Sequence, residues 1–97
     1  MAVRRYTLTA YENDGPNRFS TYKAGASLVE VGTFCLVGGD INEALEAFWA
    51  VGNKMSADAD GRQWPRSRRS MSSGDVVAWG KRRYFADFIG WKLVKTK

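Results

Sequence analysis

The chain has 97 residues, 44% of them hydrophobic, with no histidine, one cysteine and a formal net charge of +5. This is the length of a single domain whose core is confined to a sheet and one or two helices. Without histidine the chain lacks the usual general base and most metal ligands, and one cysteine excludes an internal disulfide. We therefore predict one compact domain over residues 1–97 with no catalytic residue, metal or cofactor.

No apolar run approaches the roughly 18 residues that a membrane-spanning helix needs. The segment from Met1 to Thr9 also lacks the apolar stretch of a signal peptide. We therefore expect a cytoplasmic protein without membrane contact. The single cysteine, Cys35, lies between Phe34 and Leu36, a setting that favours a small buried hydrophobic residue over a reactive thiol.

Charge is divided unequally along the chain. Residues 1–61 hold five basic and eight acidic side chains, and residues 62–97 hold ten basic and two acidic ones, so the two parts carry −3 and +8. Such a concentration favours an anionic partner, either nucleic acid or the acidic face of a protein. The alternative is a solvated surface with no partner.

The first part of the chain predicts strands. Residues 3–11 alternate, and a turn is expected over residues 12–17, which are rich in Asn, Asp and Gly. Residues 18–23 are a candidate for a second, short strand. Residues 28–37 are apolar on both sides near their end, which predicts a central strand. The apolar face of the first strand consists of Tyr6, Leu8 and Ala10.

One amphipathic helix is expected from about Ile41 to Gly52. Asp40 is a candidate N-cap, and Glu43 three positions later completes the pattern of a capping box. Gly52 and Asn53 both accept the left-handed conformation that ends many helices. The stripe expected to be buried consists of Ile41, Ala44, Leu45, Phe48 and Trp49.

After the helix, a polar loop over residues 54–68 is expected to lead to a three-strand meander. The strands are predicted at residues 76–79, 83–88 and 91–95, with turns at Gly80-Lys81 and Ile89-Gly90. In the loop, Asp58 and Asp60 are interpreted as loop formers, because a calcium site would need more oxygen ligands. The predicted fold class is α+β, a small, mostly antiparallel sheet of five to six strands packed by one helix.

The segment Ser72-Ser73-Gly74-Asp75 is interpreted as a structural turn, in which Ser and Asp side chains accept hydrogen bonds from nearby backbone amides. A minor alternative is an enzyme that works through Ser70, Ser72 or Asp75. An open cleft containing these side chains would favour that alternative, and bonds within their own turn would count against it.

The candidate partner-binding residues are the basic and aromatic residues Trp64, Arg66, Arg68, Arg69, Lys81 and Arg82. Such residues suit phosphates, stacked bases or an acidic protein surface. Trp64 stands beside Pro65 in the loop and is the aromatic residue expected to be exposed. Trp79, either Phe85 or Tyr84, and Phe88 are assigned to packing, since aromatic residues in short strands usually belong to the core.

Three segments resemble the YodL-like domain, a small module of phage and plasmid proteins. Residues 45–53 resemble the family's helix, which ends in an aromatic-Asn pair. Residues 69–77, Arg-Ser-Met-Ser-Ser-Gly-Asp-Val-Val, resemble its Arg-Ser-Leu-Ser-x-x-Asp-Val-Val turn, and residues 84–91 resemble its Tyr-x-x-Asp-x-x-Gly-Phe ending. The departures are Gly52 in place of an aromatic residue, Met71 in place of Leu and Trp91 in place of Phe.

The resemblance covers the C-terminal half to two-thirds of the chain and implies a mobile-element origin without implying a reaction. Together with the charge division, it leads us to expect a non-enzymatic accessory protein of a phage or mobile element. Such a protein would bind a host macromolecule in the bacterial cytosol, and a host protein with an acidic surface is the expected partner. The alternative is a nonspecific nucleic-acid-binding module.

Overall fold

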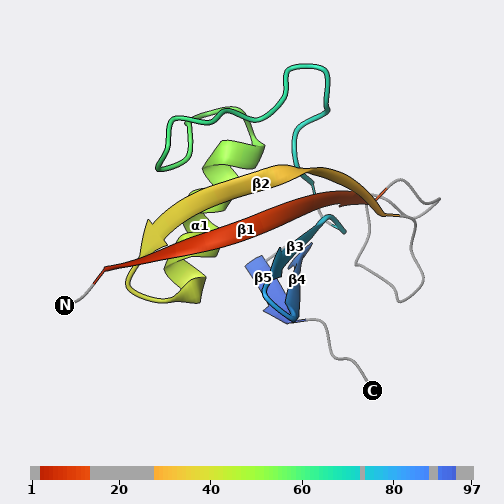
Figure 1. Cartoon of the computed structure of the whole chain (residues 1–97). Coiled ribbons are helices and arrows are strands. Elements are labelled where there is room, and N and C mark those ends of the chain that lie inside the picture. The colour runs from red at the N-terminus through yellow and green to blue at the C-terminus, as the bar shows by residue number, and fades with distance from the viewer. Residues whose placement is uncertain (1–2, 14–27, 73, 88–89, 94–97) are drawn as a thin grey trace.

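The computed structural model describes residues 3–13, 28–72, 74–87 and 90–93. Within these residues one helix accompanies an antiparallel sheet of five strands (Figure 1), which confirms the predicted α+β class. The predicted strand over residues 18–23 and the packing residue Phe88 lie outside the described residues. The elements are β1 (Arg4–Asn13), β2 (Leu28–Gly38), α1 (Ile41–Gly52), β3 (Val76–Trp79), β4 (Arg82–Asp87) and β5 (Gly90–Leu93).

The strand order is β2-β1-β3-β4-β5, so β1 lies inside the sheet, between β2 and β3. The meander of β3, β4 and β5 is confirmed. The prediction that residues 28–37 form a central strand is wrong, because β2 is at the edge of the described sheet. Its apolar end has another cause: Phe34 and Leu36 face the core, while the segment after α1 covers the β2 edge at Cys35.

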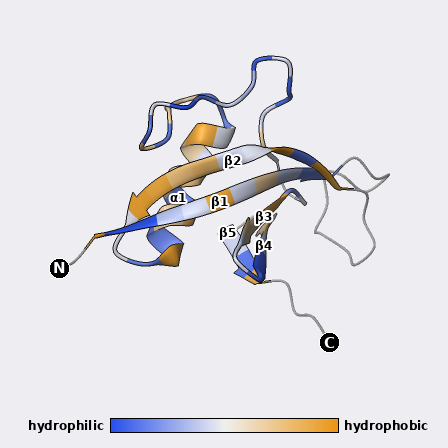
Figure 2. Cartoon of the chain, in the orientation of Figure 1, coloured by the Kyte–Doolittle hydropathy of each residue, from blue (hydrophilic) through white to orange (hydrophobic). Residues whose placement is uncertain are grey.

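Helix α1 packs on the face of the sheet that carries Tyr6, Leu8 and Ala10, all buried as predicted. Figure 2 shows hydrophobic residues along β2 and α1 and hydrophilic residues in the loop after α1. Burying each large side chain of this core contributes roughly 1.5–3 kcal/mol. Trp49 is an exception to the predicted stripe, since it is 39% exposed and Val51 is buried instead. No helix in the described part of the chain is long and apolar enough to cross a membrane.

The helix begins as its capping box predicts. The backbone N–H of Glu43 donates to the Asp40 carboxylate at 2.9 Å, and the Glu43 carboxylate accepts from the N–H of Gly39 at 3.2 Å. The C-terminal end differs from the expectation for Gly52 and Asn53. The left-handed residue is Lys54, with φ of 63°, one position beyond Asn53.

Gly52 is required by a close approach to the turn that precedes β3. A Cβ at this position would lie 2.8 Å from Cβ of Met71, too close for two carbon atoms. Met71 is also anchored here, since its N–H donates to the Gly52 carbonyl at 2.8 Å. This contact explains the glycine at the point where the YodL-like pattern has an aromatic residue.

Gly52→Ala should lower the free energy of unfolding by about 1–2 kcal/mol, because the new methyl group would push Met71 out of the core and outweigh the gain in helix propensity. Urea unfolding measures the change. Gly32→Ala is the matched control, since its Cβ would meet the Phe34 ring at an ordinary 3.6 Å. Equal losses in the two variants would contradict the steric explanation.

Candidate functional site

Trp64, expected to be the exposed aromatic residue, is only 3% exposed. Its ring stacks on Phe34 at 5.7 Å between centroids and contacts Phe48 at 6.2 Å. The indole N–H donates to the carbonyl of Arg69 at 2.9 Å. The prediction is therefore wrong, because an indole that finds both an aromatic cluster and a hydrogen-bond acceptor gains more from burial than from water. Trp64 anchors the loop in the core.

Arg69 is held by two buried carboxylates rather than directed at solvent. Its guanidinium donates to both oxygens of Asp75, each at 2.9 Å, and lies 3.0 Å from Glu12. The Asp75 side chain is fully buried, the Glu12 side chain is 2% exposed and the Arg69 side chain is 24% exposed. We call Arg69, Glu12 and Asp75 the ion-pair network. It uses the planar geometry of the guanidinium, which lysine cannot reproduce.

The network also explains the Ser-x-x-Asp turn. Asp75 accepts hydrogen bonds from the N–H of Ser72 at 2.8 Å and from the N–H of Asn13 at 2.9 Å. The Ser72 hydroxyl accepts from Arg69 at 3.0 Å. The structural interpretation is therefore confirmed for Asp75, whereas Ser73 of the predicted turn lies outside the described residues. Asp75 has no surface at which to meet a substrate. Glu12 and Asn13, expected in a turn, instead end β1, where they meet the network.

Arg68 lies at the rim of the ion-pair network. Its Nε is 3.5 Å from Glu12, and its side chain is 34% exposed. Charge on Arg68 is thus partly compensated within the fold. Of the three arginines between residues 66 and 69, only Arg66 is exposed.

Asp58 closes part of the outer edge of β2. Its carboxylate accepts hydrogen bonds from the backbone N–H of Cys35, Asp60 and Arg62 at 2.7–3.0 Å. The N–H of Ala59 donates to the Cys35 carbonyl. Burial alone would raise the pKa of Asp58, but the three N–H donors and the Arg62 charge outweigh it, so the pKa lies below its ordinary value. The expected role of Asp58 as a loop former is confirmed, and Cys35 is buried as predicted.

Beside this edge lies an open groove of about 700 Å³, lined by Arg5, Thr7, Thr33 and Cys35 among others. Arg5 pairs with Asp60 at 2.7 Å, and both side chains are 61% exposed. The hydrogen bond and the charge of Asp60 raise the pKa of Arg5 above its ordinary value. In the described residues, no group of three or more His, Cys, Asp or Glu could hold a metal ion.

The exposed cations gather where β3 turns into β4. Lys81, Arg82 and Arg83 are all exposed, and we call them the basic hairpin. The guanidinium of Arg82 lies 5.9 Å from the Trp79 ring, and that of Arg83 lies 6.0 Å from the Tyr11 ring. Adjacent residues of a strand point to opposite faces, so the hairpin presents charge on both sides of the sheet. No described carboxylate lies within 4 Å of these three cations.

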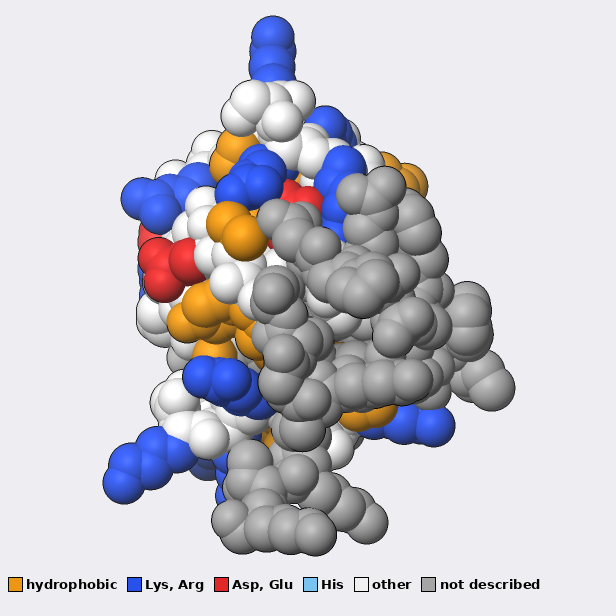
Figure 3. Space-filling view, turned by 90° about the vertical axis from the view of Figure 1, so that its right-hand side faces the viewer, with side chains coloured by type: hydrophobic (Ala, Val, Ile, Leu, Met, Phe, Trp, Pro, Cys, Tyr) orange, Lys and Arg blue, Asp and Glu red, His pale blue; other side chains and the backbone are white. Residues whose placement is uncertain are grey.

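Arg4 and Arg5 lie at the same end of the sheet as the basic hairpin. Tyr6, which follows them in β1, contacts Trp79 at 5.2 Å between ring centroids. Figure 3 shows Lys and Arg side chains spread more widely than Asp and Glu over the face it displays. Exposed acidic residues cluster instead at the start of α1 and along it, at Asp40, Glu43 and Glu46.

The structure therefore leaves Arg66, Lys81 and Arg82 of the predicted partner-binding set in solvent and places Trp64 and Arg69 in the fold. Arg5 and Lys54 are exposed cations that the prediction missed. Lys54 has no basic neighbour in the sequence and Arg5 has only Arg4, so neither residue belongs to a dense run of charge that would have indicated it. Arg5 is paired with Asp60, far along the chain, and Lys54 lines one pocket with the distant Arg66.

Comparisons with protein-family models, with curated proteins and with solved structures give no match. The resemblance to the YodL-like domain stays a prediction that depends on the three segments quoted above.

Arg69→Met should lower the free energy of unfolding by about 3–5 kcal/mol, because it leaves two carboxylates buried without their cation. Urea unfolding at neutral pH measures the loss. Arg68→Met is the matched control and should cost about 1 kcal/mol or less, because its pair is longer and partly exposed. Similar losses for the two variants would show that the ion-pair network is not the main constraint.

Asp58→Asn should lower the free energy of unfolding by about 1.5–3 kcal/mol at neutral pH, since charge-assisted hydrogen bonds are lost. The pKa of Asp58 is lower in the folded state, so its stabilisation is present above about pH 4 and disappears as pH falls through the folded pKa. The difference in free energy of unfolding between wild type and Asp58→Asn should therefore become smaller in acid.

Hydrogen exchange at the Cys35 amide, which should be faster in Asp58→Asn, provides a local measurement. Asp60→Asn is the control, because its ion pair is exposed and contributes little. If the difference in free energy of unfolding between wild type and Asp58→Asn stays constant from pH 7 to pH 3, the assigned role of the Asp58 carboxylate is wrong.

Proposed function

We propose that the chain is a non-enzymatic binding module that contacts the acidic surface of a protein through the basic hairpin. The observation that supports this most is the contrast between compensated and uncompensated cations. Arg69 is neutralised inside the fold, whereas Lys81, Arg82 and Arg83 are exposed without a described carboxylate nearby. Uncompensated charge at the tip of a hairpin raises the rate of encounter with an oppositely charged surface.

An acidic protein suits the hairpin better than a stretch of bases does. Base recognition by stacking needs exposed aromatic rings beside the cations. Trp64 is buried, and Trp79 packs its ring against Tyr6. The exposed Trp49 lies on α1 near Glu46, where phosphates would be repelled. Nucleic acid is the second candidate, favoured by the same three cations as phosphate contacts.

The resemblance to the YodL-like domain extends the proposal to the origin of the protein and to its setting. It supports an accessory role in a phage or other mobile element, with a host protein in the bacterial cytoplasm as the partner. This extension depends on the resemblance alone, and the basic hairpin does not require it.

Affinity capture from a nuclease-treated bacterial lysate tests the proposal. The triple variant K81E/R82E/R83E should capture at least tenfold less partner than wild type at about 150 mM salt, because charges at the rim of an interface control the rate of association. The matched control, R4E/R62E/K92E, changes net charge equally at three exposed positions outside the hairpin. If both variants capture equally less partner, or if the captured proteins are the same with and without the hairpin charges, the hairpin is not the binding surface.

Titration of labelled duplex and single-stranded DNA at two salt concentrations separates the second candidate. Phosphate contacts predict binding that weakens steeply with salt and that the hairpin variant abolishes. If the chain binds DNA in this way and captures no protein, the partner is nucleic acid rather than an acidic protein. Absence of binding at low salt would remove nucleic acid.

A further inference from the structure

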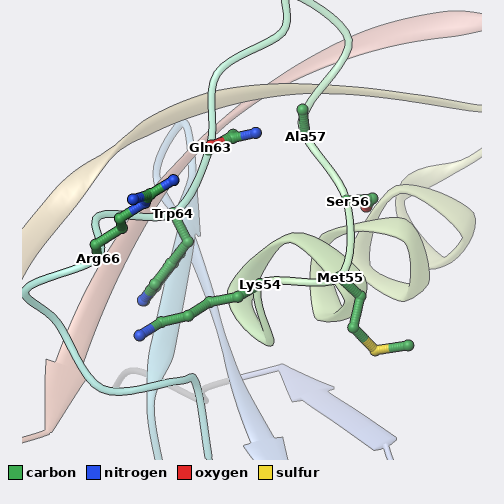
Figure 4. Close-up of a pocket in the computed structure, with 7 residues that line it drawn as sticks. All are labelled: Lys54, Met55, Ser56, Ala57, Gln63, Trp64 and Arg66. Atoms are coloured by element: carbon green, nitrogen blue, oxygen red, sulfur yellow. The ribbon is translucent and has the colours of Figure 1, made fainter.

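A second cluster of polar side chains lies at the C-terminal end of α1, away from the basic hairpin. It surrounds a pocket of about 280 Å³, smaller than the pockets that hold drug-sized ligands. Figure 4 shows Lys54 extending toward the indole of Trp64, while Met55 points away. Arg66 approaches from the other segment that lines the pocket. The lining consists of Lys54, Met55, Ser56, Ala57, Gln63, Trp64 and Arg66.

The two cations of this pocket have no counter-charge in the described structure. The lining contains no acidic residue, and the side chains of Lys54 and Arg66 form no ion pair with a described residue. Ser56 and Gln63 add a hydroxyl and an amide, both of which can donate. The lining therefore combines two cationic and two polar side chains with the Trp64 indole, and Figure 4 shows Lys54 and Arg66 near opposite ends of the Trp64 side chain.

Capping of the helix does not account for Lys54. A basic side chain at this point often bonds to the last carbonyl groups of a helix. Here the carbonyls of residues 49–52 already accept from backbone N–H groups of Asn53, Met55, Lys54 and Met71, respectively. No hydrogen bond joins the Lys54 ammonium group to these carbonyls in the described structure, so the group can meet another partner.

The backbone conformation of Lys54 also indicates that its side chain has a role outside the fold. The N–H of Met55 donates to the Ala50 carbonyl and the N–H of Lys54 to the Val51 carbonyl, which is the Schellman pattern. The left-handed position in that motif favours glycine, yet it holds Lys54 at φ of 63°. A side chain kept at a position where glycine would be more stable suggests a functional use.

We propose that this pocket binds a phosphate monoester group, with Lys54 and Arg66 as its two charged ligands. A phosphate monoester carries a charge between −1.5 and −2 at neutral pH, which matches the two cations. The guanidinium offers a paired set of donors and the ammonium a point charge, a combination that suits phosphate oxygens. The site is independent of the basic hairpin and of its proposed partner.

Titration with inorganic phosphate at constant ionic strength, followed by NMR shifts of the Ser56 and Ala57 amides and the Trp64 indole N–H, tests the site. Lys54→Gly and Arg66→Gln should each weaken binding roughly tenfold or more, because each removes a charged hydrogen-bond donor. Phosphoserine and adenosine monophosphate, titrated in the same way, distinguish a phosphorylated side chain from a nucleotide as the carrier.

Two measurements separate loss of the site from loss of the fold. Lys54→Gly should melt at or above the wild-type temperature, since glycine relieves the left-handed strain. The hairpin variant Arg82→Gln should bind phosphate as wild type does. Unchanged affinity in Lys54→Gly, or equal weakening in Arg82→Gln, would overturn the proposal. If the protein binds phosphate normally but captures no partner, the phosphate site is supported and only the function proposed for the hairpin is wrong.

Discussion

The ion pair between Arg69 and the carboxylates of Glu12 and Asp75 is the constraint on which the centre of this fold depends. It joins the end of β1 to the turn that starts β3, two segments far apart in the chain. Removing such charges from water is costly, and only the bidentate geometry and the surrounding hydrogen bonds offset the loss of hydration. The turn is therefore held in one arrangement, with Met71 on Gly52 and Trp64 bonded to the Arg69 carbonyl.

This arrangement divides the arginines into two classes. Arg69 and, in part, Arg68 serve the interior, whereas the cations of the hairpin and of the Lys54 pocket form no ion pair with a carboxylate of the described residues. A sequence in which basic residues cluster therefore does not mark one basic surface. Two separate groups of exposed cations emerge, one at the tip of a hairpin and one at the end of a helix.

Much of the fold could be predicted because its signals are local. The capping box of Asp40 and Glu43, the apolar period of α1 and the Gly80-Lys81 turn each act within a few residues. The strand order could not be predicted, since it depends on pairing between β1 and β3. The site was harder still: the fate of Trp64 depends on Phe34, and that of Arg69 depends on Glu12, neither of which is near it in the chain.

The position of β1 between β2 and β3 has a consequence for how the protein folds. β1 and β2 can pair early, but the other edge of β1 stays unpaired until residues 76–78 have been synthesised. The long loop that β1–β3 pairing closes makes this step slow compared with forming the helix. Until β3 is available, the pair of β1 and β2 exposes a strand edge that could join another chain, and pairing with β3 removes this risk.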